Sequence, residues 1–333
     1  MWFEDLVGFA EEHPDQVRAN LEASDELLRS KVNGRTFGCG ELTTPSLEEL
    51  RAETGCLSEH RDLVVEEVVA DVQALHLEPA AAGACFQVAS QFNLLEMTGP
   101  GVTPENGVGI YEYDRTQGPA CAIACGAGTV YRNYFADVGN GQVGQTAARQ
   151  IDCLADLGQI LGNDDDALWS MQNGYALASL DGLRAIGELV AVAGEQEREA
   201  LRGKLRIGVH SNVEVTLKGA GHRVTQIYAS ALPVAYSEFS ADHWEPFARL
   251  VLEASYEATL RAAAIQAGER EGACEVYLTR LGGGAFGNRS EWIIDAVRRA
   301  LHLVEGAGLR VRIVSYGGSQ PDVAKLAGEF SEY

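Results

Sequence analysis

Apolar residues recur with helical spacing in two segments of the last third of the chain. In the first segment they lie at positions i, i+3, i+4, i+7 and i+11, on one face of a helix: Phe247, Leu250, Val251, Ala254 and Ala258. The second face is formed by Ile293, Ala296, Val297, Ala300, Leu301 and Val304. Strands are predicted on either side of the second helix, at residues 275–281 and 309–316. Strands separated by such helices need crossover connections, so we expect an α/β fold with a partly parallel sheet covered on both faces.

The pattern upstream is less regular. Four further strands are expected, at residues 63–72, 85–88, 205–216 and 223–232. Residues 99–145 are rich in glycine and proline and are expected to form a long ordered loop region, followed by mostly helical stretches at 145–161 and 180–202. We therefore expect an insertion at about 99–204 within an α/β domain of residues 61–333.

The first 60 residues are expected to form an N-terminal helical and hairpin cap. Its predicted parts are a helix at residues 4–12 that Pro14 ends, a hairpin turn at Asn33-Gly34, and a short helix that Thr44 and Pro45 begin.

The net charge of the chain limits the classes of binding partner that we expect. The 333 residues carry a net charge of −22, and a surface that acidic repels phosphate backbones and anionic lipid. We expect no binding to bulk nucleic acid or to membranes, although a small anion can still bind backbone N–H groups in one pocket. The first residues are acidic where a signal peptide needs Lys or Arg, so a cytoplasmic protein is expected.

Cysteine and histidine spacing indicates no dedicated metal site. The seven cysteines form no CxxC pair, and the seven histidines include no HExxH and no close pair. We expect neither a bound metal nor a cofactor.

A glycine-rich segment between a predicted strand and a predicted helix is the strongest chemical signal: Leu281-Gly282-Gly283-Gly284-Ala285-Phe286-Gly287-Asn288. Without Cβ atoms a backbone can approach a phosphate closely, and the helix end that follows adds free N–H donors. A plain tight turn is the structural alternative. The spacing Gly282-x-Gly284-x-x-Gly287 also matches the dinucleotide fingerprint, so an NAD(P)-dependent oxidoreductase stays open, although the next strand ends at Tyr316 without the acid that would hold a ribose.

The stretch from residue 223 to 316 resembles the C-terminal half of a macrodomain, the ADP-ribose-binding module. Upstream, residues 88–95 look like the strand-to-loop segment of that family, of which Asn93 is retained, and residues 117–123 resemble its first phosphate loop. Asp71 lies 22 residues before Asn93, where the family places an acid. The resemblance implies a divergent macrodomain: a three-layer α/β/α mixed sheet that binds ADP-ribose.

The resemblance assigns a role to each part of the site. Asp71 would accept the adenine amino group, Tyr316 would close the adenine side, Phe286 would cover the diphosphate or a sugar, and the loop amides would bind phosphate. An arginine flanked by aromatic residues, Arg132, is a further candidate for nucleotide contact. The full set of expected ligand-binding residues is Asp71, Gln117, Gly118, Arg132, Gly283, Gly284, Ala285, Phe286, Gly287, Asn288 and Tyr316. Each of these side chains also has an interpretation without a ligand: a solvated acid, a core Phe, an edge Tyr, or a surface arginine that balances nearby acids.

The catalytic residues expected are Asn93, Asp114 and Glu96. Asn93 would hydrogen-bond the distal ribose, or form only an Asx turn. Asp114 is the first choice and Glu96 the second for the group that activates water. The resemblance thus implies an enzyme that hydrolyses a glycosidic or ester ADP-ribosyl linkage, acting on ADP-ribose derivatives or ADP-ribosylated substrates. A reader that binds ADP-ribose without turnover is the alternative.

Overall fold

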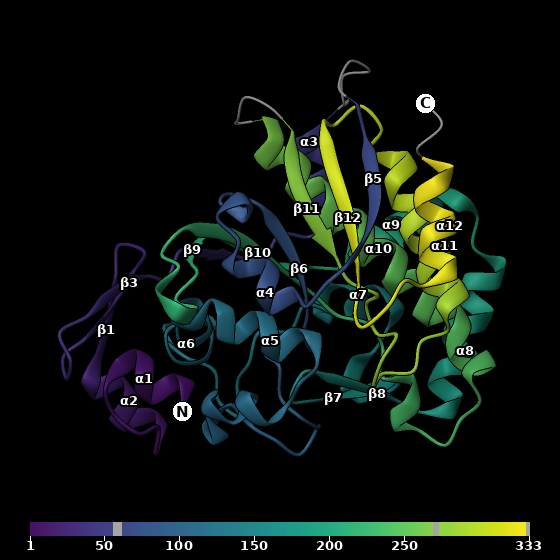
Figure 1. Ribbon diagram of the computed structural model, residues 1–333. Coiled ribbons are helices and arrows are strands. Elements are labelled where there is room, and N and C mark those ends of the chain that lie inside the picture. The colour runs from purple at the N-terminus through teal and green to yellow at the C-terminus, as the bar shows by residue number, and fades with distance from the viewer. Residues whose placement is uncertain (56–61, 269–272, 331–333) are drawn as a thin grey trace.

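Seven strands form the central sheet within the part of the chain that the computed structural model describes, residues 1–55, 62–268 and 273–330. Their spatial order is β4 (Glu41–Thr43), β9 (Gly208–Glu214), β10 (Arg223–Ala229), β6 (Cys85–Ala89), β11 (Cys274–Leu278), β12 (Leu309–Ser315) and β5 (Val64–Val69). The five strands from β10 to β5 are parallel neighbours, whereas β9 runs antiparallel to both β10 and β4. The sheet is therefore mixed, and β6 lies at its centre (Figure 1).

Helices cover both faces of this sheet (Figure 1). The long helix α10 packs against α3, α8, α9 and α11 on one side, while α5 contacts α4, α6 and β6 on the other. The bounds of these elements are α3 (Leu47–Thr54), α4 (Val72–Leu77), α5 (Gln117–Ala124), α6 (Gly126–Tyr134), α8 (Leu180–Val192), α9 (Glu195–Gly203), α10 (Ala241–Gly268) and α11 (Ser290–Leu303). The first four residues of β6 are buried, as a strand covered on both faces requires. The expected three-layer α/β/α mixed sheet is confirmed.

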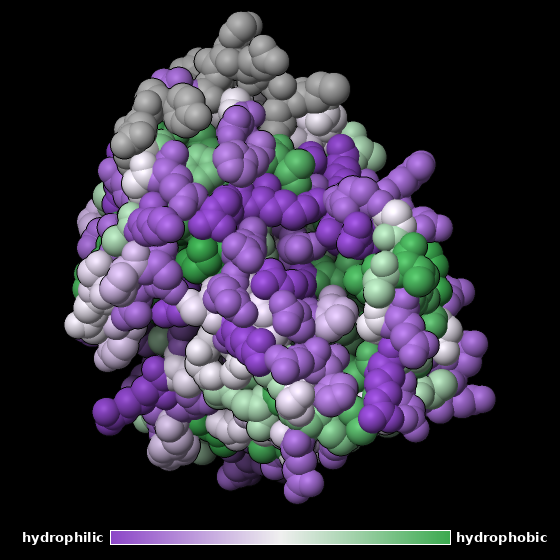
Figure 2. Space-filling view, turned by 90° about the vertical axis from the view of Figure 1, so that its right-hand side faces the viewer, coloured by the Kyte–Doolittle hydropathy of each residue, from purple (hydrophilic) through white to green (hydrophobic). Residues whose placement is uncertain are grey.

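The remaining regular elements lie around this core. They are α7 (Ala155–Leu161), α12 (Pro321–Glu329), the hairpin β7 (Trp169–Gln172) and β8 (Tyr175–Ala178), and short 3-10 helices at Pro79–Ala81, Pro104–Asn106, Gly109–Tyr113, Asp164–Asp166, Leu217–Gly219 and Val234–Tyr236. The surface formed by α8, α11 and α12, which faces the reader in Figure 2, is mostly hydrophilic. None of the described helices has the length and apolar character needed to cross a membrane.

The N-terminal residues form a small unit that shares a second hydrophobic core with residues 95–134. It contains α1 (Trp2–Val7), α2 (Pro14–Asn20) and a three-stranded antiparallel sheet of β1 (Leu21–Ser24), β2 (Leu27–Ser30) and β3 (Thr36–Gly38). The apolar side chains of α1 pack with those of α6 and the β1–β3 sheet. The strand β4 and the helix α3 join the main sheet and its helical layer instead. The boundary predicted between residues 60 and 61 lies outside the described residues.

Several predicted elements need correction. The first helix ends at Val7 because Gly8 adopts a left-handed conformation, and Pro14 begins α2 rather than ending a helix. Residues 117–134, expected as loop, form α5 and α6. The hairpin β7–β8 interrupts the expected helical insertion, and its turn is Asn173-Gly174, with both residues at positive φ.

A buried carboxylate joins helices α10, α3 and α11, which lie on the same side of the sheet. Glu257 of α10 is 1% exposed and accepts hydrogen bonds from Arg51 of α3 (2.7 Å), Arg261 of α10 (2.8 Å) and Arg299 of α11 (2.8 Å). Burial by itself would raise the pKa of Glu257, but the three guanidinium groups outweigh it and lower the pKa to about 2.

We expect Glu257→Gln to lower the free energy of unfolding by about 3 kcal/mol at pH 7. The pKa of Glu257 is lower in the folded state than in the unfolded chain, so this stabilisation is present above about pH 4.5 and is lost as the pH falls toward 2. Urea unfolding of both proteins from pH 7 to pH 3 measures the difference. The control is Asp181→Asn, which removes an exposed partner of Arg184 and should change stability by less than about 0.5 kcal/mol. Equal stability of Glu257→Gln and wild type at pH 7 would contradict this assignment.

Candidate functional site

Two adjoining cavities lie at the carboxyl ends of the parallel strands. The inner cavity, of about 210 Å³, is lined by residues that follow β6, β10 and β11 and by the segment that leads into α5. The outer cavity, of about 580 Å³, continues toward α4 and the end of β12. Six residues line both cavities: Asp114, Thr116, Gln117, Thr279, Arg280 and Gly284. The two cavities therefore form one continuous groove at the sheet edge where ligands of α/β proteins bind.

The glycine-rich loop after β11 leaves three consecutive backbone donors free. Gly283 N–H bonds Arg280 O, Gly287 N–H bonds Gly284 O, and Asn288 N–H bonds Gly282 O, each at 3.0 Å. Within the described residues, the N–H groups of Gly284, Ala285 and Phe286 have no partner, and all three residues line the inner cavity. Gly282 is at positive φ, and a Cβ there would lie 2.5 Å from the Cβ of Ala231. The loop is thus closed by its own bonds and presents a run of amides to the cavity.

The first turn of α5 supplies donors from another side of the inner cavity. The N–H groups of Gln117 and Gly118 have no partner among the described residues, while Thr116 N–H bonds Asp114 Oδ1 at 2.8 Å. A Cβ on Gly118 would lie 2.1 Å from Ala89 O and 3.1 Å from Glu96 Cγ. Glycine is required at 118 because the end of β6 packs directly against the helix. The helix N-terminus therefore borders the same cavity as the glycine-rich loop.

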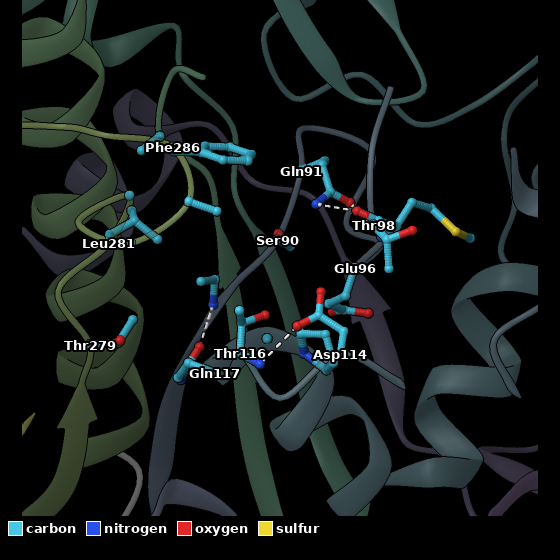
Figure 3. A pocket seen from close by; sticks show the side chains of 18 of the residues that line it. Ser90, Gln91, Glu96, Thr98, Asp114, Thr116, Gln117, Thr279, Leu281 and Phe286 are labelled. Carbon is cyan, nitrogen blue, oxygen red and sulfur yellow. Dashed lines mark hydrogen bonds between the residues drawn. The ribbon is translucent and has the colours of Figure 1, made fainter. Parts of the chain in front are cut away.

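The side chain of Gln117 has a structural role as well. Its Oε1 accepts from Ala89 N–H at 2.9 Å and its Nε2 donates to Gln87 O at 2.8 Å, so the amide bonds the backbone of β6 (Figure 3). What Gln117 offers to a ligand is its backbone N–H.

Two carboxyl groups border the inner cavity, in different surroundings. Glu96 is 2% exposed, and Arg132 Nη2 donates to its two oxygens at 3.0 and 3.1 Å. Burial raises the pKa of Glu96 to about 7, although Arg132 lowers it in part. Asp114 is half-buried and lines both cavities. Both carboxyls lie on the side of the cavity opposite Leu281 and Thr279 (Figure 3). A carboxyl that titrates near neutral pH beside a second acid is suited to acid–base chemistry.

Two of the predicted adenine contacts lie in the outer cavity. Asp71 and Tyr316 both line it, and Tyr316 is 80% exposed. Asp71 is the N-cap of α4, with Oδ1 accepting from Gln73 N–H at 2.7 Å and Ala74 N–H at 3.4 Å. Its other oxygen has no hydrogen bond to the described residues.

Arg132 and Asn93 do not reach either cavity, so the roles predicted for them are wrong. Arg132 is fully buried; it pairs with Glu96, donates to Leu94 O at 3.0 Å and lies 3.8 Å from the ring centre of Tyr228. Asn93 is fully buried too. Its Nδ2 donates to Gln150 Oε1 at 2.7 Å and its Oδ1 accepts from Leu95 N–H at 3.1 Å, which is the Asx turn.

Three residues of the glycine-rich loop are also structural. The N–H groups of Gly283 and Gly287 are already bonded within the loop, and neither residue lines the inner cavity. The Asn288 amide is buried and donates to Leu232 O at 2.9 Å. The predicted ligand contacts at these three positions are therefore wrong.

Several lining residues escaped the sequence analysis, among them Ser90, Arg280, Tyr175 and Trp2. Ser90 follows the central strand, and Arg280 precedes the glycine-rich loop; the inner cavity has no other cation among its described lining residues. Tyr175 comes from the β7–β8 hairpin, which the Asn173-Gly174 pair could have indicated. Trp2 of α1 lines the outer cavity, so the N-terminal unit borders the groove.

Within the described ranges, no group of three or more His, Cys, Asp or Glu residues is placed to hold a metal ion.

Solved structures to which this chain is similar include poly(ADP-ribose) glycohydrolases. No protein-family model matches the chain, and no curated protein matches its sequence. The enzyme from Deinococcus radiodurans in complex with ADP-ribose is 13% identical, with a TM-score of 0.46 over 87% of this chain and 92% of that one. The enzyme from Thermomonospora curvata bound to the inhibitor ADP-HPD is 12% identical, with a TM-score of 0.40 over 95% of this chain and 94% of that one. At these identities and scores, the likeness alone assigns neither a family nor an activity to this chain.

Proposed function

We propose that this chain binds ADP-ribose or an ADP-ribosyl group along the two cavities and hydrolyses the ADP-ribosyl linkage. One observation carries the proposal: unbonded amides of Gln117 and Gly118 and of Gly284, Ala285 and Phe286 border the same cavity, next to Glu96 and Asp114. Backbone donors from two segments suit a diphosphate, which presents anionic oxygens on several sides.

The residues that line the groove support one order of the ligand groups along it. The adenosine occupies the outer cavity, where Asp71 accepts from the adenine amino group and Tyr316 covers the ring. The diphosphate lies where the two cavities meet, because Gly284 and Gln117 line both. The distal ribose then enters the inner cavity, beside Glu96 and Asp114.

The charge of the protein explains why the donors are backbone groups. The chain has a net charge of −22, and four acids line the groove, Asp71, Glu96, Glu112 and Asp114, against the cations Arg115 and Arg280. Amides and helix ends attract an anion without adding a titratable group. Arg280 adds a cation at the meeting point of the two cavities, and its guanidinium also pairs with Asp322 at 3.4 Å.

The proposed reaction uses the two carboxyl groups in separate roles. Water attacks the anomeric carbon of the distal ribose, the bond from this carbon to the leaving atom breaks, and a proton passes from the water to the leaving group. Glu96 exchanges that proton, because its pKa of about 7 lets it take up and release a proton at neutral pH. Asp114 orients the water or a ribose hydroxyl as an acceptor. This would make the chain a divergent member of the macrodomain family, as the residues after β10 indicate.

Titration and turnover test the proposal together. Isothermal titration should show micromolar binding of ADP-ribose and none of NADH, and incubation with mono-ADP-ribosylated protein or poly(ADP-ribose) should release ADP-ribose. Binding without release would identify a reader. Binding of NADH without ADP-ribose would favour an oxidoreductase and contradict the proposal.

A further inference from the structure

The lining of the inner cavity contains a serine hydroxyl that has no hydrogen-bond partner among the described residues. Ser90 is the residue after β6, the central strand, and it is 4% exposed. Its Oγ is buried and makes no hydrogen bond to any described residue. The residue lines the inner cavity and not the outer one. In Figure 3 it lies between Phe286 on one side and Glu96 and Asp114 on the other.

The neighbouring amide side chains have their hydrogen bonds inside the protein. Gln91 Nε2 donates to Met97 O at 3.2 Å, and its Oε1 accepts from Met97 N–H at 2.8 Å. Gln117 bonds the backbone of β6 through both atoms of its amide. Ser90 therefore differs from both in keeping its hydrogen-bonding capacity unused, which is costly for a buried polar group unless a ligand or water supplies the partner.

The backbone holds Ser90 in this place. Its N–H bonds Ala229 O at 3.1 Å, which continues the pairing of β6 with β10 by one residue. This bond fixes the Cα of Ser90 at the end of the central strand, so only rotation about the Cα–Cβ bond can move the hydroxyl.

We propose that the Ser90 hydroxyl hydrogen-bonds a hydroxyl group of the distal ribose. This inference rests on the proposed function and assigns one more residue to the same site. The distal ribose is the part of the ligand in the inner cavity, and a hydroxyl can both donate to and accept from a sugar hydroxyl. Ser90 thereby helps the site to distinguish ADP-ribose from ADP, which lacks that sugar.

The test is Ser90→Ala, measured on both stability and affinity. The melting temperature should stay the same or rise, because the substitution removes a buried hydroxyl without a partner. Affinity for ADP-ribose should fall about tenfold, the value of one hydrogen bond of about 1.4 kcal/mol. Affinity for ADP should equal that of wild type.

A matched control is Ser255→Ala. Ser255 is fully buried on α10, and its Oγ donates to Ser230 O at 3.0 Å. This variant should lose melting temperature and keep wild-type affinity for both nucleotides, the opposite pattern to Ser90→Ala.

Each other outcome overturns the inference. Wild-type affinity for ADP-ribose in Ser90→Ala would remove the hydroxyl from the site, and an equal loss for ADP would place it at the diphosphate. A lower melting temperature in Ser90→Ala would show that the hydroxyl has a partner within the protein. If wild type binds ADP but not ADP-ribose, or binds neither, the proposed function fails first and this inference fails with it.

Discussion

Gly284→Glu is expected to lower the affinity for ADP-ribose by at least about 100-fold and to leave the fold intact. A Cβ at position 284 would meet no atom within 4 Å, and the residue is not at positive φ, so the backbone accepts a side chain there. The new carboxylate would enter the groove at the point where both cavities meet. A like charge beside a diphosphate, together with the blocked volume, removes more than about 2.7 kcal/mol of binding free energy.

Two control variants distinguish the effect of the added negative charge from the effect of replacing a glycine. Gly284→Ala adds one carbon into open space and should lower affinity far less. Gly328→Glu places the same residue on α12, also in open space and away from both cavities, and should bind as wild type does. Isothermal titration and circular dichroism are the measurements. If a folded Gly284→Glu protein keeps its affinity, the glycine-rich loop is not part of the site.

Glu96→Gln is expected to reduce turnover by about 10²- to 10⁴-fold while changing the affinity for ADP-ribose only a few-fold. The amide keeps the size of the side chain and can still accept a hydrogen bond from Arg132, but it cannot exchange a proton. In wild type, Glu96 is the base only in its ionised form. The wild-type rate should therefore rise as the pH passes through about 7 and level off above it. The variant should not show this rise of the rate with pH.

Glu188→Gln is the matched control, since Glu188 is exposed on α8 and lines neither cavity. It should keep both the rate and the pH profile. Release of ADP-ribose from an ADP-ribosylated protein, followed from pH 5 to pH 9, measures all three proteins. A proportional loss of affinity and turnover in Glu96→Gln would show that Glu96 only positions the ligand.

The last third of the fold could be predicted from the sequence because its periodicity is strong. The two apolar faces became α10 and α11, and the glycine-rich segment lies between β11 and α11 as expected. In the insertion the same local rules predicted the helical stretch of α8 and α9 but missed α5 and α6, where tertiary packing decides the structure. Helices α5 and α6 begin with residues such as Gly118 and Gly126, which are poor helix formers but are required by close contacts with Ala89 and Trp2.

The site was predicted in part, and burial separates the residues predicted correctly from those predicted wrongly. Free amides at Gly118, Gly284, Ala285 and Phe286 follow from local geometry that glycine spacing indicates. Arg132 was misread, because nothing in a sequence separates an arginine that meets a ligand from one that pairs with a buried acid such as Glu96. Ser90 escaped notice because its importance lies in a missing partner, which only coordinates reveal.

A crystal structure of the Glu96→Gln protein with ADP-ribose tests the central claim most directly. The account predicts that diphosphate oxygens lie within hydrogen-bond distance of the N–H groups of Gly118 and of Ala285 or Phe286, with adenine beside Asp71. A diphosphate bound elsewhere on the protein, with those amides in contact only with water, would contradict it.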